Sequence, residues 1–489
     1  MAPYAVVGAC SAATYSCEET IEILGKRLEA GDTLLKVAYC AKHYGVALFR
    51  SGCLILLAPG FPEYHGSTVQ NGEDNVKDVA AGDTHIVFCK EDGTVHSFGY
   101  SNIYGQLGDG SVWTSHKAEG GEDSDDGVPA LSAPKMISGF GNGSYDVDGG
   151  DVIEGRRLCV PITAVSCGSH HTLLMTRKCN AVYGCGLGLS GQLGGKRKPP
   201  LQASFKSIRL LFGLPIRQIA AAGNHSFVLL QTGKLLAFGD NTSGQLGLGS
   251  TKAVGTPTPV AIRSVSPQPR GNENLDSYAI KTLRAAWGSA ESMYFPLRVE
   301  RISPELGPGE ARIVSIWCSA NRSVLLTSDM DWLSCGLPIS RSRCIGDGQQ
   351  QRMDRYGALG RWIKDKREST WFGKMRWSER LGVAIKTTFP SLAGDALLEA
   401  ARSEVRLVCF NHFVVLLIPG KDASNKSLLF LQGEGQSVET VQGGERLSVA
   451  AVARADKLLQ DREVDDDSCE YALSGGHAIV ATDHFLAVI

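Results

Sequence analysis

The chain has 489 residues and carries 49 Lys plus Arg against 51 Asp plus Glu, so its formal net charge is only −2. This balance excludes a global electrostatic field that favours nucleic acid or membrane surfaces, and any charged partner must meet a local patch. The 14 cysteines include no CxxC pair, which argues against a zinc or disulfide framework. Glycine contributes 57 residues, an excess over the usual ~7% that suits a fold with many tight turns.

The amino-terminal stretch lacks the features of an export signal. No basic residue precedes Lys26, so the short apolar run near the start has no charged flank. No stretch reaches the ~20 apolar residues that a membrane-spanning helix needs. We therefore expect a cytoplasmic or nuclear protein that is neither secreted nor membrane-spanning. Residues 17–34 predict a short amphipathic helix that caps the fold. Its inward side chains are Ile21, Ile23, Leu24 and Leu28.

A β-hairpin unit recurs along the rest of the chain. In its clearest copy, two apolar runs flank the Thr232-Gly233 turn, and a G-Q-L-G turn follows at residues 244–247. Two such runs joined by a short glycine-containing turn are typical of a hairpin. In chain order the copies occupy residues 37–60, 79–111, 165–195, 217–250, 314–336 and 405–435, and a half copy occupies residues 479–489.

These repeats predict an all-β fold, a seven-bladed β-propeller. There are seven starts, and the last has only one strand. We expect the apolar run Tyr4–Gly8 to supply the missing partner, so that the N- and C-terminal strands pair. Such pairing closes the ring and removes the exposed edges that an open array would leave.

Three inserted loops interrupt this single propeller domain, residues 1–489. The step between successive G-Q-L-G turns is shortest from Gly191 to Gly244 and longer elsewhere. The insertions fall at about residues 112–160, 264–310 and 338–400. The first is rich in Gly, Ser and acidic residues and predicts a disordered acidic loop, whereas the third is basic and rich in tryptophan.

Histidines occupy nearly the same register in most repeats. They are His43, His85, His170 or His171, His225, His412 and His484, and Arg322 replaces histidine in the fifth copy. A metal ring is one interpretation, but each histidine belongs to a different blade and lacks close ligand neighbours. We therefore expect each to bond to neighbouring backbone within its own blade. Because these histidines have structural positions in the repeat, no catalytic Ser-His-Asp or Cys-His arrangement can be assembled from them. We therefore expect neither enzyme activity nor a cofactor.

The repeat resembles a known family. The succession V-x-C/A-G-x-x-H, apolar strand, glycine turn, aromatic-Gly pair and G-Q-L-G resembles the regulator-of-chromosome-condensation repeat, most clearly over residues 79–250. The resemblance implies a seven-bladed propeller with the closure inferred above. The founding member is an exchange factor for the GTPase Ran, docked on chromatin, and it uses a short β-wedge. No wedge residue can be carried over to the acidic insertion. Other members are scaffolds, ubiquitin-ligase modules or ciliary and cytoskeletal adaptors.

The third insertion contains the candidate partner-binding residues. Between Arg341 and Lys386 there are 12 Lys or Arg against five Asp or Glu, and aromatic residues alternate with the basic ones. This pattern suits an acidic protein partner, or phosphate contacts with base stacking. The alternative is a surface arm whose tryptophans pack on the propeller wall. The candidates are Arg361, Trp362, Lys364, Lys366, Arg367, Trp371, Lys374, Arg376, Trp377 and Arg380.

We interpret the chain as a non-catalytic propeller scaffold that mediates protein–protein interaction as a monomer within a complex. Its expected partners are proteins, such as a small GTPase or an acidic protein, rather than nucleic acid or membrane. Two alternatives remain open at this point. One is a chromatin-associated guanine-nucleotide exchange factor for a Ran-type GTPase, and the other is a structural component of a ciliary or cytoskeletal assembly.

Overall fold

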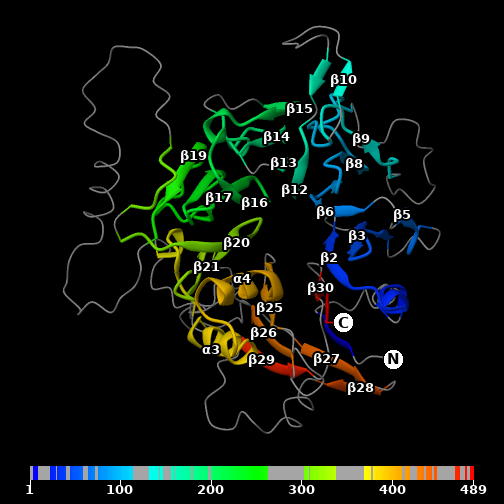
Figure 1. Ribbon diagram of the computed structural model, residues 1–489. Coiled ribbons are helices and arrows are strands. Elements are labelled where there is room, and N and C mark those ends of the chain that lie inside the picture. Colours follow the sequence, from blue (N-terminus) through cyan, green and yellow to red (C-terminus); the bar gives the residue numbers. More distant parts are fainter. Residues whose placement is uncertain are drawn as a thin grey trace, which may run out of the picture.

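Figure 1 shows the computed structural model of the chain, in which β-sheets are arranged around a common centre. The structure describes residues 4–8, 22–28, 30–39, 44–58, 64–71, 75–113, 131–141, 144–146, 156–158, 160–177, 180–195, 200–262, 302–307, 309–337, 368–375, 378–409, 413–418, 427–433, 437–442, 445–448, 468–473, 479–481 and 485–488.

Within these residues the strands form seven sheets of four or five strands, numbered here as blades 1 to 7, and one separate two-stranded hairpin. In blades 1 to 5 the four strands are consecutive and antiparallel, apart from the separate hairpin between blades 2 and 3. The first three blades are β2 (Leu34–Tyr39), β3 (Gly45–Phe49), β4 (Leu54–Leu57) and β5 (Thr68–Gln70); β6 (Val76–Ala81), β7 (His85–Lys90), β8 (Val95–Gly99) and β9 (Lys135–Met136); and β12 (Ile162–Cys167), β13 (His171–Thr176), β14 (Val182–Leu187) and β15 (Leu201–Ser207).

The next three blades complete most of the ring. They are β16 (Ile216–Ala222), β17 (His225–Leu230), β18 (Leu235–Gly239) and β19 (Val254–Val260); β20 (Ile313–Ser319), β21 (Arg322–Thr327), β22 (Trp332–Gly336) and β23 (Gly373–Lys374); and β24 (Arg406–Cys409), β25 (Phe413–Ile418), β26 (Ser427–Gly433) and β29 (Ser468–Leu473). In blade 6 the chain leaves after β26 and returns as β29, so the outermost strand is not the next one in sequence.

Blade 7 joins the two ends of the chain. Its strands, in sheet order, are β28 (Glu445–Ser448), β27 (Ser437–Gln442), β1 (Tyr4–Gly8), β31 (Phe485–Val488) and β30 (Ile479–Ala481). Strand β1 pairs antiparallel with β31, with Ala5 opposite Val488 and Gly8 opposite Phe485. The predicted pairing of the first and last strands is therefore confirmed. The excursion from blade 6 adds β27 and β28 to the other side of β1.

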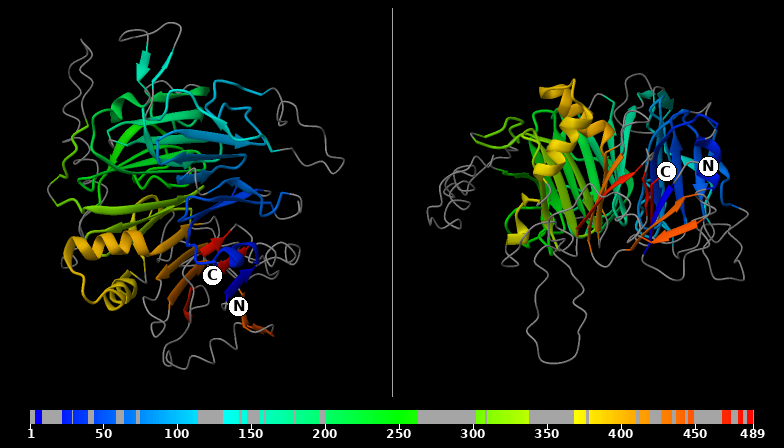
Figure 2. Two further views of the ribbon diagram at one scale, coloured as in Figure 1. Left: turned by 45° about the vertical axis from the view of Figure 1, so that its right-hand side comes forward. Right: turned by 90° about the horizontal axis from the view of Figure 1, so that it is seen from below.

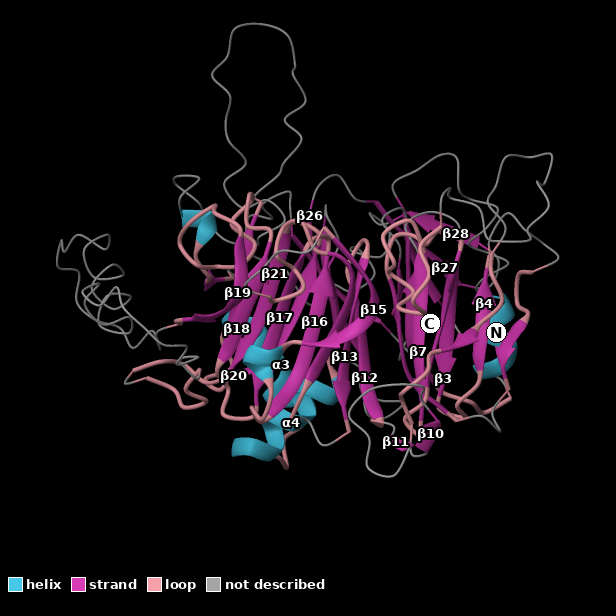
Figure 3. Cartoon of the chain, turned by 90° about the horizontal axis from the view of Figure 1, so that it is seen from above, coloured by secondary structure: helices cyan, strands magenta, loops and turns pink. Residues whose placement is uncertain are grey.

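The first strands of neighbouring blades contact one another in a closed circuit. It runs from β2 through β6, β12, β16, β20, β24 and β30 and back to β2. The views in Figure 2 and Figure 3 show the sheets standing side by side around this circuit. The all-β propeller predicted from the repeats is confirmed, and the circuit is consistent with the predicted number of blades.

Polar side chains tie the first strands together. Lys36 of blade 1 forms an ion pair of 2.8 Å with Asp78 of blade 2. The same Asp78 accepts a hydrogen bond of 3.0 Å from the backbone N–H of Val165 in blade 3. Between blades 4 and 5, the side-chain amide of Gln218 donates to the carbonyl of Ile316 at 2.7 Å. The inner wall is therefore cross-linked across several seams.

The hydrophobic core lies between the blades. Both faces of a blade pack against neighbours, so the second strands are buried along their whole length, as in β13, β17 and β21. One cluster joins Leu173 and Met175 of blade 3 to Val228, Leu236 and Phe238 of blade 4. Two-sided burial explains why these strands are continuous apolar runs rather than alternating ones.

Short helices cover parts of the ring. A helix at residues 22–28 places Leu24, which is fully buried, against Phe49 and Leu57 of blade 1. It forms part of the helix predicted over residues 17–34, and Ile21 lies outside the described residues. Two 3-10 turns, η2 (Arg209–Leu211) and η4 (Glu368–Thr370), contact β19 and β22, respectively.

Two α-helices occupy the connection between blades 5 and 6. They are α3 (Ser378–Thr388) and α4 (Gly394–Glu404). Leu381 and Ile385 of α3 and Leu397 of α4 pack in one cluster with Trp332 of blade 5 and Leu416 of blade 6. This part of the predicted basic insertion is thus a folded helical pair bound to the propeller (Figure 3).

Strands also occur within the predicted acidic insertion. Strand β9 completes blade 2, and β10 (Ser144–Asp146) pairs antiparallel with β11 (Arg156–Leu158). This hairpin lies in the connection between blades 2 and 3 and stands out beyond the sheets in Figure 1 and Figure 2. Residues 114–130 and 147–155 lie outside the described residues.

Candidate functional site

A hydroxyl group links blade 2 to blade 3 at the start of their second strands. Thr172 donates its hydroxyl proton to the backbone carbonyl of Gln106, at 2.9 Å. Its oxygen also lies 2.9 Å from Nε2 of His85. Because the hydroxyl proton is already committed to Gln106, His85 must donate from Nε2 to this oxygen. The thiol of Cys185 donates to the same carbonyl at 3.5 Å.

The same arrangement recurs at the following seams. Ser226 of blade 4 donates to the carbonyl of Gln192 at 2.9 Å and contacts Nε2 of His171 at 2.9 Å. Ser323 of blade 5 donates to the carbonyl of Gln245 at 2.8 Å. The three glutamines belong to G-Q-L-G turns, so each turn is held by the hydroxyl of the next blade.

The repeat histidines are structural in the described blades. His85, His171 and His225 are fully buried. Burial lowers the pKa of His85 and His171 to about 3 and that of His225 to about 4, so all three are neutral near pH 7. The predicted bond to backbone within the same blade is wrong for His85 and His171. Their side chains leave the strand start across the seam, where a hydroxyl of the next blade is nearest.

The buried thiols are also held in their neutral form. Burial raises the pKa of Cys89 and Cys185 and raises that of Cys167 to about 12. A thiol that stays protonated is a poor nucleophile and packs as a small apolar group. Among the described residues, no group of three His, Cys, Asp or Glu side chains is placed to hold a metal ion.

Each described G-Q-L-G turn of blades 2 and 4 docks on the outer strands of the next blade. Gly108 has φ +71°, and a Cβ there would lie 2.1 Å from the ring of Phe205 in blade 3. Gly247 has φ +67°, and a Cβ there would lie 2.3 Å from the ring of Phe372 in blade 5. Only glycine combines this left-handed backbone with this close approach.

Backbone pairing places further residues of the two junctions in register. Asp109 forms an isolated antiparallel bridge with Ser204, and Leu248 forms one with Trp371. Asp109 and Leu248 each follow the last glycine of their turn directly. Trp371 therefore occupies in blade 5 the position that Ser204 occupies in blade 3.

The structure describes three of the predicted partner-binding residues. Trp371 is 40% exposed and lies over Gly249, where an added Cβ would clash with its ring. Lys374 is paired with Asp331 at 2.8 Å and Glu379 at 3.5 Å. Arg380 is exposed on α3. The other candidates lie outside the described residues: Arg361, Trp362, Lys364, Lys366, Arg367, Arg376 and Trp377. Partner binding by this set remains a prediction.

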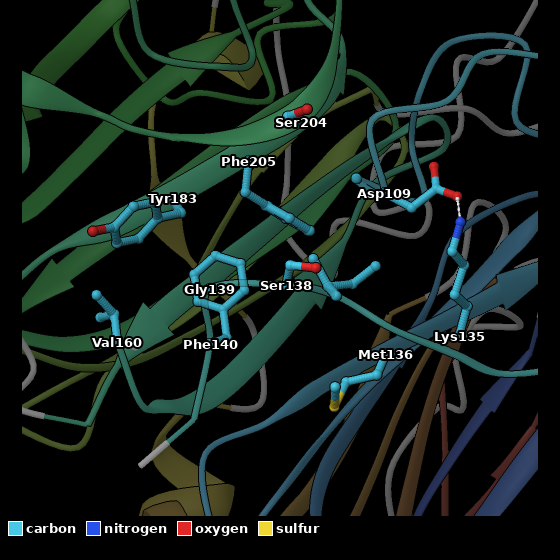
Figure 4. Close-up of a pocket in the computed structure, with 12 residues that line it drawn as sticks. Asp109, Lys135, Met136, Ser138, Gly139, Phe140, Val160, Tyr183, Ser204 and Phe205 are labelled. Atoms are coloured by element: carbon cyan, nitrogen blue, oxygen red, sulfur yellow. Dashed lines mark hydrogen bonds and ion pairs between the residues drawn. The ribbon is translucent and has the colours of Figure 1, made fainter. Parts of the chain in front are cut away.

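A cavity of about 420 Å³ lies between the outer strands of blades 2 and 3. Phe140, Tyr183 and Phe205 line one part of it, with Phe140 edge-on to each of the other rings at 5.6 Å. Asp109 and Lys135 form an ion pair of 3.0 Å at another part, as Figure 4 shows. The lining thus combines an aromatic wall with a fixed pair of charges.

The two charges of this ion pair differ in their surroundings. Asp109 is only 8% exposed in its side chain, and it also accepts hydrogen bonds from Asn102 and from the N–H and hydroxyl of Ser111. Burial opposes its ionisation, but the bonds from Ser111 and Lys135 hold the pKa of Asp109 below its usual range. Lys135 is 65% exposed, so its ammonium group faces solvent.

Exposed apolar side chains lie on the turn and the strands of this junction, and Met136 is the one of them that lines the cavity. The turn of blade 2 runs on along β15, with the N–H of Gly110 donating to the carbonyl of Ala203 at 3.1 Å. Leu201 begins β15 opposite Leu187. The exposed side chains are Val112 (42%), Met136 (59%), Leu189 (62%) and Leu201 (38%). We refer to these four residues and the cavity together as the blade 2–3 surface.

Family models match the hairpin repeats. The model described as Regulator of chromosome condensation (RCC1) repeat matches residues 76–106 and 216–245, and a second model of the same description matches residues 232–270. These stretches contain the hairpins of blades 2 and 4. The G-Q-L-G turn of blade 4 lies within residues 232–270, and that of blade 2 begins where the first match ends. The chain carries RCC1 repeats. The family resemblance seen in the sequence is therefore confirmed.

Curated relatives share the RCC1 repeats over part of this chain. The chain is 31% identical over 200 residues to "Probable E3 ubiquitin-protein ligase HERC4" of Rattus norvegicus, covering 35% of this chain and 18% of that protein. It is 33% identical over 213 residues to "Probable E3 ubiquitin-protein ligase HERC3" of Homo sapiens, covering 38% and 19%. The match therefore spans about a fifth of the length of these relatives.

Solved structures with RCC1-type propellers show the same fold. The crystal structure of human WBSCR16 has a TM-score of 0.50 at 15% identity, covering 93% of this chain and 86% of that chain. Prp20p from Saccharomyces cerevisiae has a TM-score of 0.51 at 13% identity, covering 99% and 90%. Its structure is described with its binding properties to Gsp1p and histones. In the part of this chain that the structure describes, no helix is long and apolar enough to cross a membrane.

The RCC1 repeat also explains what the sequence analysis missed in blade 5. Its fourth strand follows β22 only after a long insertion, so it was assigned to the basic arm. The run Thr370-Trp371-Phe372 corresponds to Ala203-Ser204-Phe205 in blade 3, where both phenylalanines meet the glycine of the preceding turn. That phenylalanine is the signal from which the strand could be found.

Proposed function

We propose that this chain is a non-catalytic RCC1-type propeller that binds protein partners, and that the blade 2–3 surface is one of its contact surfaces. The observation that carries the proposal is that Val112, Met136, Leu189 and Leu201 are exposed apolar side chains on the two blades that form one cavity, which Met136 lines. Exposed apolar side chains together with a cavity at one junction favour protein docking over simple solvation. Scattered exposed apolar residues alone would carry no such meaning.

The energetics favour this surface for binding. Full burial of one large apolar side chain contributes roughly 1.5–3 kcal/mol. Met136 and Leu189 are more than half exposed, so most of that contribution is still available. The surface is also held by backbone pairing between the blade 2 turn and β15, so little ordering is needed on association.

The basic, tryptophan-containing segment is proposed as a second contact surface for an acidic protein. Its positive charge and aromatic side chains support this role. Replacing Lys364, Lys366 and Arg367 together with Glu is the test. We expect loss of acidic partners, and unchanged retention of every partner would contradict this part of the proposal.

The nature of the partners is supported by related propellers. Prp20p is described with Gsp1p and histones, and in another structure with Kap60 bound. These are proteins, which fits a scaffold whose described buried histidines and thiols are neutral and used in packing. Partners of this chain are therefore sought among nuclear and cytoplasmic proteins.

The test compares one surface with another. The double variant Leu189→Glu/Leu201→Glu alters the blade 2–3 surface, and Val383→Glu on α3 alters an equally exposed apolar residue elsewhere. Tagged chains are purified from cells after chemical crosslinking, and the bound proteins are quantified. We expect the double variant to lose at least one specific partner that Val383→Glu retains. Equal partner sets for all three chains would contradict the proposed surface.

A guanine-nucleotide exchange factor is the second candidate function. The β10–β11 hairpin favours it, because a protruding hairpin between blades 2 and 3 is the kind of element that exchange by a β-wedge requires. The assay mixes the chain with Ran loaded with labelled GDP. Faster release at sub-stoichiometric chain, lost when residues 144–158 are replaced by a Gly-Ser linker, would favour this candidate over the scaffold.

A further inference from the structure

We propose that the cavity between blades 2 and 3 binds an apolar side chain of a linear peptide segment in which the neighbouring residue carries a carboxylate. This inference rests on the proposed function, since it names the chemistry of a partner at the blade 2–3 surface. Three observations carry it: a serine at the cavity where another junction of the ring carries a tryptophan, an aromatic wall, and an exposed cation fixed at the edge.

The residue that pairs with the turn is small at this cavity. At the junction of blades 4 and 5, Trp371 lies over the turn and its ring contacts Gly249. At the junction of blades 2 and 3, the corresponding residue is Ser204, and an added Cβ on Gly110 would have only its hydroxyl within 4 Å, at 3.5 Å. An aromatic side chain therefore fits beside the turn at the junction of blades 4 and 5. At the junction of blades 2 and 3, Ser204 lines the cavity and leaves the space beside Gly110 open.

The wall of the cavity suits an apolar group. Phe140, Tyr183 and Phe205 present ring edges and faces to the space, and Met136 lies at its border (Figure 4). A cavity of about 420 Å³ is within the usual range of roughly 300–1,000 Å³ for ligand sites. One large side chain of a peptide fits it, with its backbone lying along the outer strands.

The charges at the edge favour an acidic neighbour over a basic one. Asp109 already accepts bonds from Asn102, Ser111 and Lys135 and is almost completely covered, so it offers little to a cation. Lys135 has three N–H donors, and the hydrogen bond to Asp109 uses one of them. Its ammonium is thus held in place and exposed, and it can donate a hydrogen bond to a carboxylate of a partner.

The probe is a phage-displayed library of random linear peptides, selected against the full chain and again against three variants. Ser204→Trp places in the cavity lining the side chain that blade 5 carries at the corresponding position. Lys135→Glu reverses the charge at the edge, and Lys252→Glu is a matched control on an exposed lysine of blade 4. Circular dichroism and thermal unfolding verify that each variant is folded before selection.

We expect selected peptides to share a Phe, Leu or Met next to Asp or Glu. For a labelled synthetic copy, Ser204→Trp should weaken binding about thirtyfold, as for loss of a central anchor. Lys135→Gln should weaken it about twofold to fivefold, as for an exposed ion pair. Lys135→Glu should select basic peptides instead, and Lys252→Glu should behave as the unchanged chain.

The outcomes separate this inference from the proposed function. Selected peptides without an acidic residue, or equal binding by Ser204→Trp, would overturn the inference. If partners from cells are still lost with Leu189→Glu/Leu201→Glu in that case, the contact surface stands and only the chemistry of the cavity is wrong. If no partner depends on that surface either, the proposed function fails as well.

Discussion

The junction of blades 2 and 3 and the junction of blades 4 and 5 share one scaffold but differ in what fills it. In both, a glycine with positive φ meets a phenylalanine of the next blade, and a bridge pairs the following residue with the outer strand. In the first junction the bridged pair is Asp109 and Ser204, and in the second it is Leu248 and Trp371. The bridged pair is therefore polar in the first junction and apolar in the second.

The comparison shows how a repeat fold supports a site. The hydroxyl groups of Thr172, Ser226 and Ser323 hold the turns in the same way at successive seams, and we call them the hydroxyl row. With the glycine contacts, they keep the backbone the same from blade to blade, so side chains on the outer strand can vary with little cost to ring closure. We expect stability to depend on the shared positions, and the proposed binding to depend on the variable ones. The following experiments test this division.

The largest effect is expected at the shared glycines. Gly108→Ala and Gly247→Ala should each lower the free energy of unfolding by about 3 kcal/mol, from left-handed backbone strain plus a clash with phenylalanine. Urea unfolding of each variant measures it. Gly213→Ala is the control, because it has φ +79° and no atom within 4 Å of an added Cβ. If the losses of unfolding free energy for Gly108→Ala and Gly247→Ala differ widely, the two junctions do not share one scaffold.

A reciprocal exchange should convert one junction into the other. Trp371→Ser should lower the free energy of unfolding by about 2 kcal/mol, less than for a fully buried tryptophan because the ring is 40% exposed. Ser204→Trp should change it by no more than about 0.5 kcal/mol, since the space is open. Thermal and urea unfolding report both values. Strong destabilisation by Ser204→Trp would show that the cavity is not equivalent to the site in blade 5.

Removal of a hydroxyl should lower stability more at the seam between blades 2 and 3 than at the seam between blades 4 and 5. Thr172→Val keeps the shape but leaves His85 Nε2 without this bond, at a cost of about 1.5 kcal/mol. Ser323→Ala removes one donor to Gln245, whose carbonyl also accepts from Cys335, and should cost about 1 kcal/mol. Urea midpoints compare the two variants. A larger loss for Ser323→Ala would reverse this ranking.

The smallest expected effect is a dependence of stability on pH, which arises only at the junction of blades 2 and 3. The folded pKa of Asp109 lies below its ordinary value, so its ionised form stabilises the fold above about pH 4. This contribution is lost as pH falls through the lowered pKa. Asp109→Asn should therefore cost up to about 1 kcal/mol at pH 7, and the difference from the unchanged chain should shrink in acid. Leu248→Asn is the control at the corresponding position. Because leucine does not titrate, the stability difference caused by this variant should not shrink in acid.

The sequence was sufficient for the parts of the fold that repeat. The hairpin runs predicted the blades, and the half copy at the end predicted the pairing with Tyr4–Gly8. The helices α3 and α4 were missed, although Leu381 and Ile385 are spaced four residues apart, as in an amphipathic helix. Basic and aromatic composition drew attention away from that spacing.

The candidate site depended on contacts between blades and could not be predicted in the same way. The partner of His85 is a hydroxyl 87 residues later, and only the seam geometry selects it over local backbone. The cavity depends on Ser204 and Trp371 occupying corresponding positions, and the insertion before Trp371 hides that correspondence in the sequence. Lys135 and Phe140 lie in a segment that the sequence pattern assigned to an acidic loop.

The pairing of Tyr4–Gly8 with Phe485–Val488 has a consequence for biosynthesis. The first of these strands is synthesised before all the blades, and its neighbour only after the other six blades. Until then, the nascent chain holds a growing row of blades with an unsatisfied edge at its start, a stage at which aggregation competes with folding. Assembly of the ring therefore waits for the last strand, and its speed is set by how quickly two distant segments find each other.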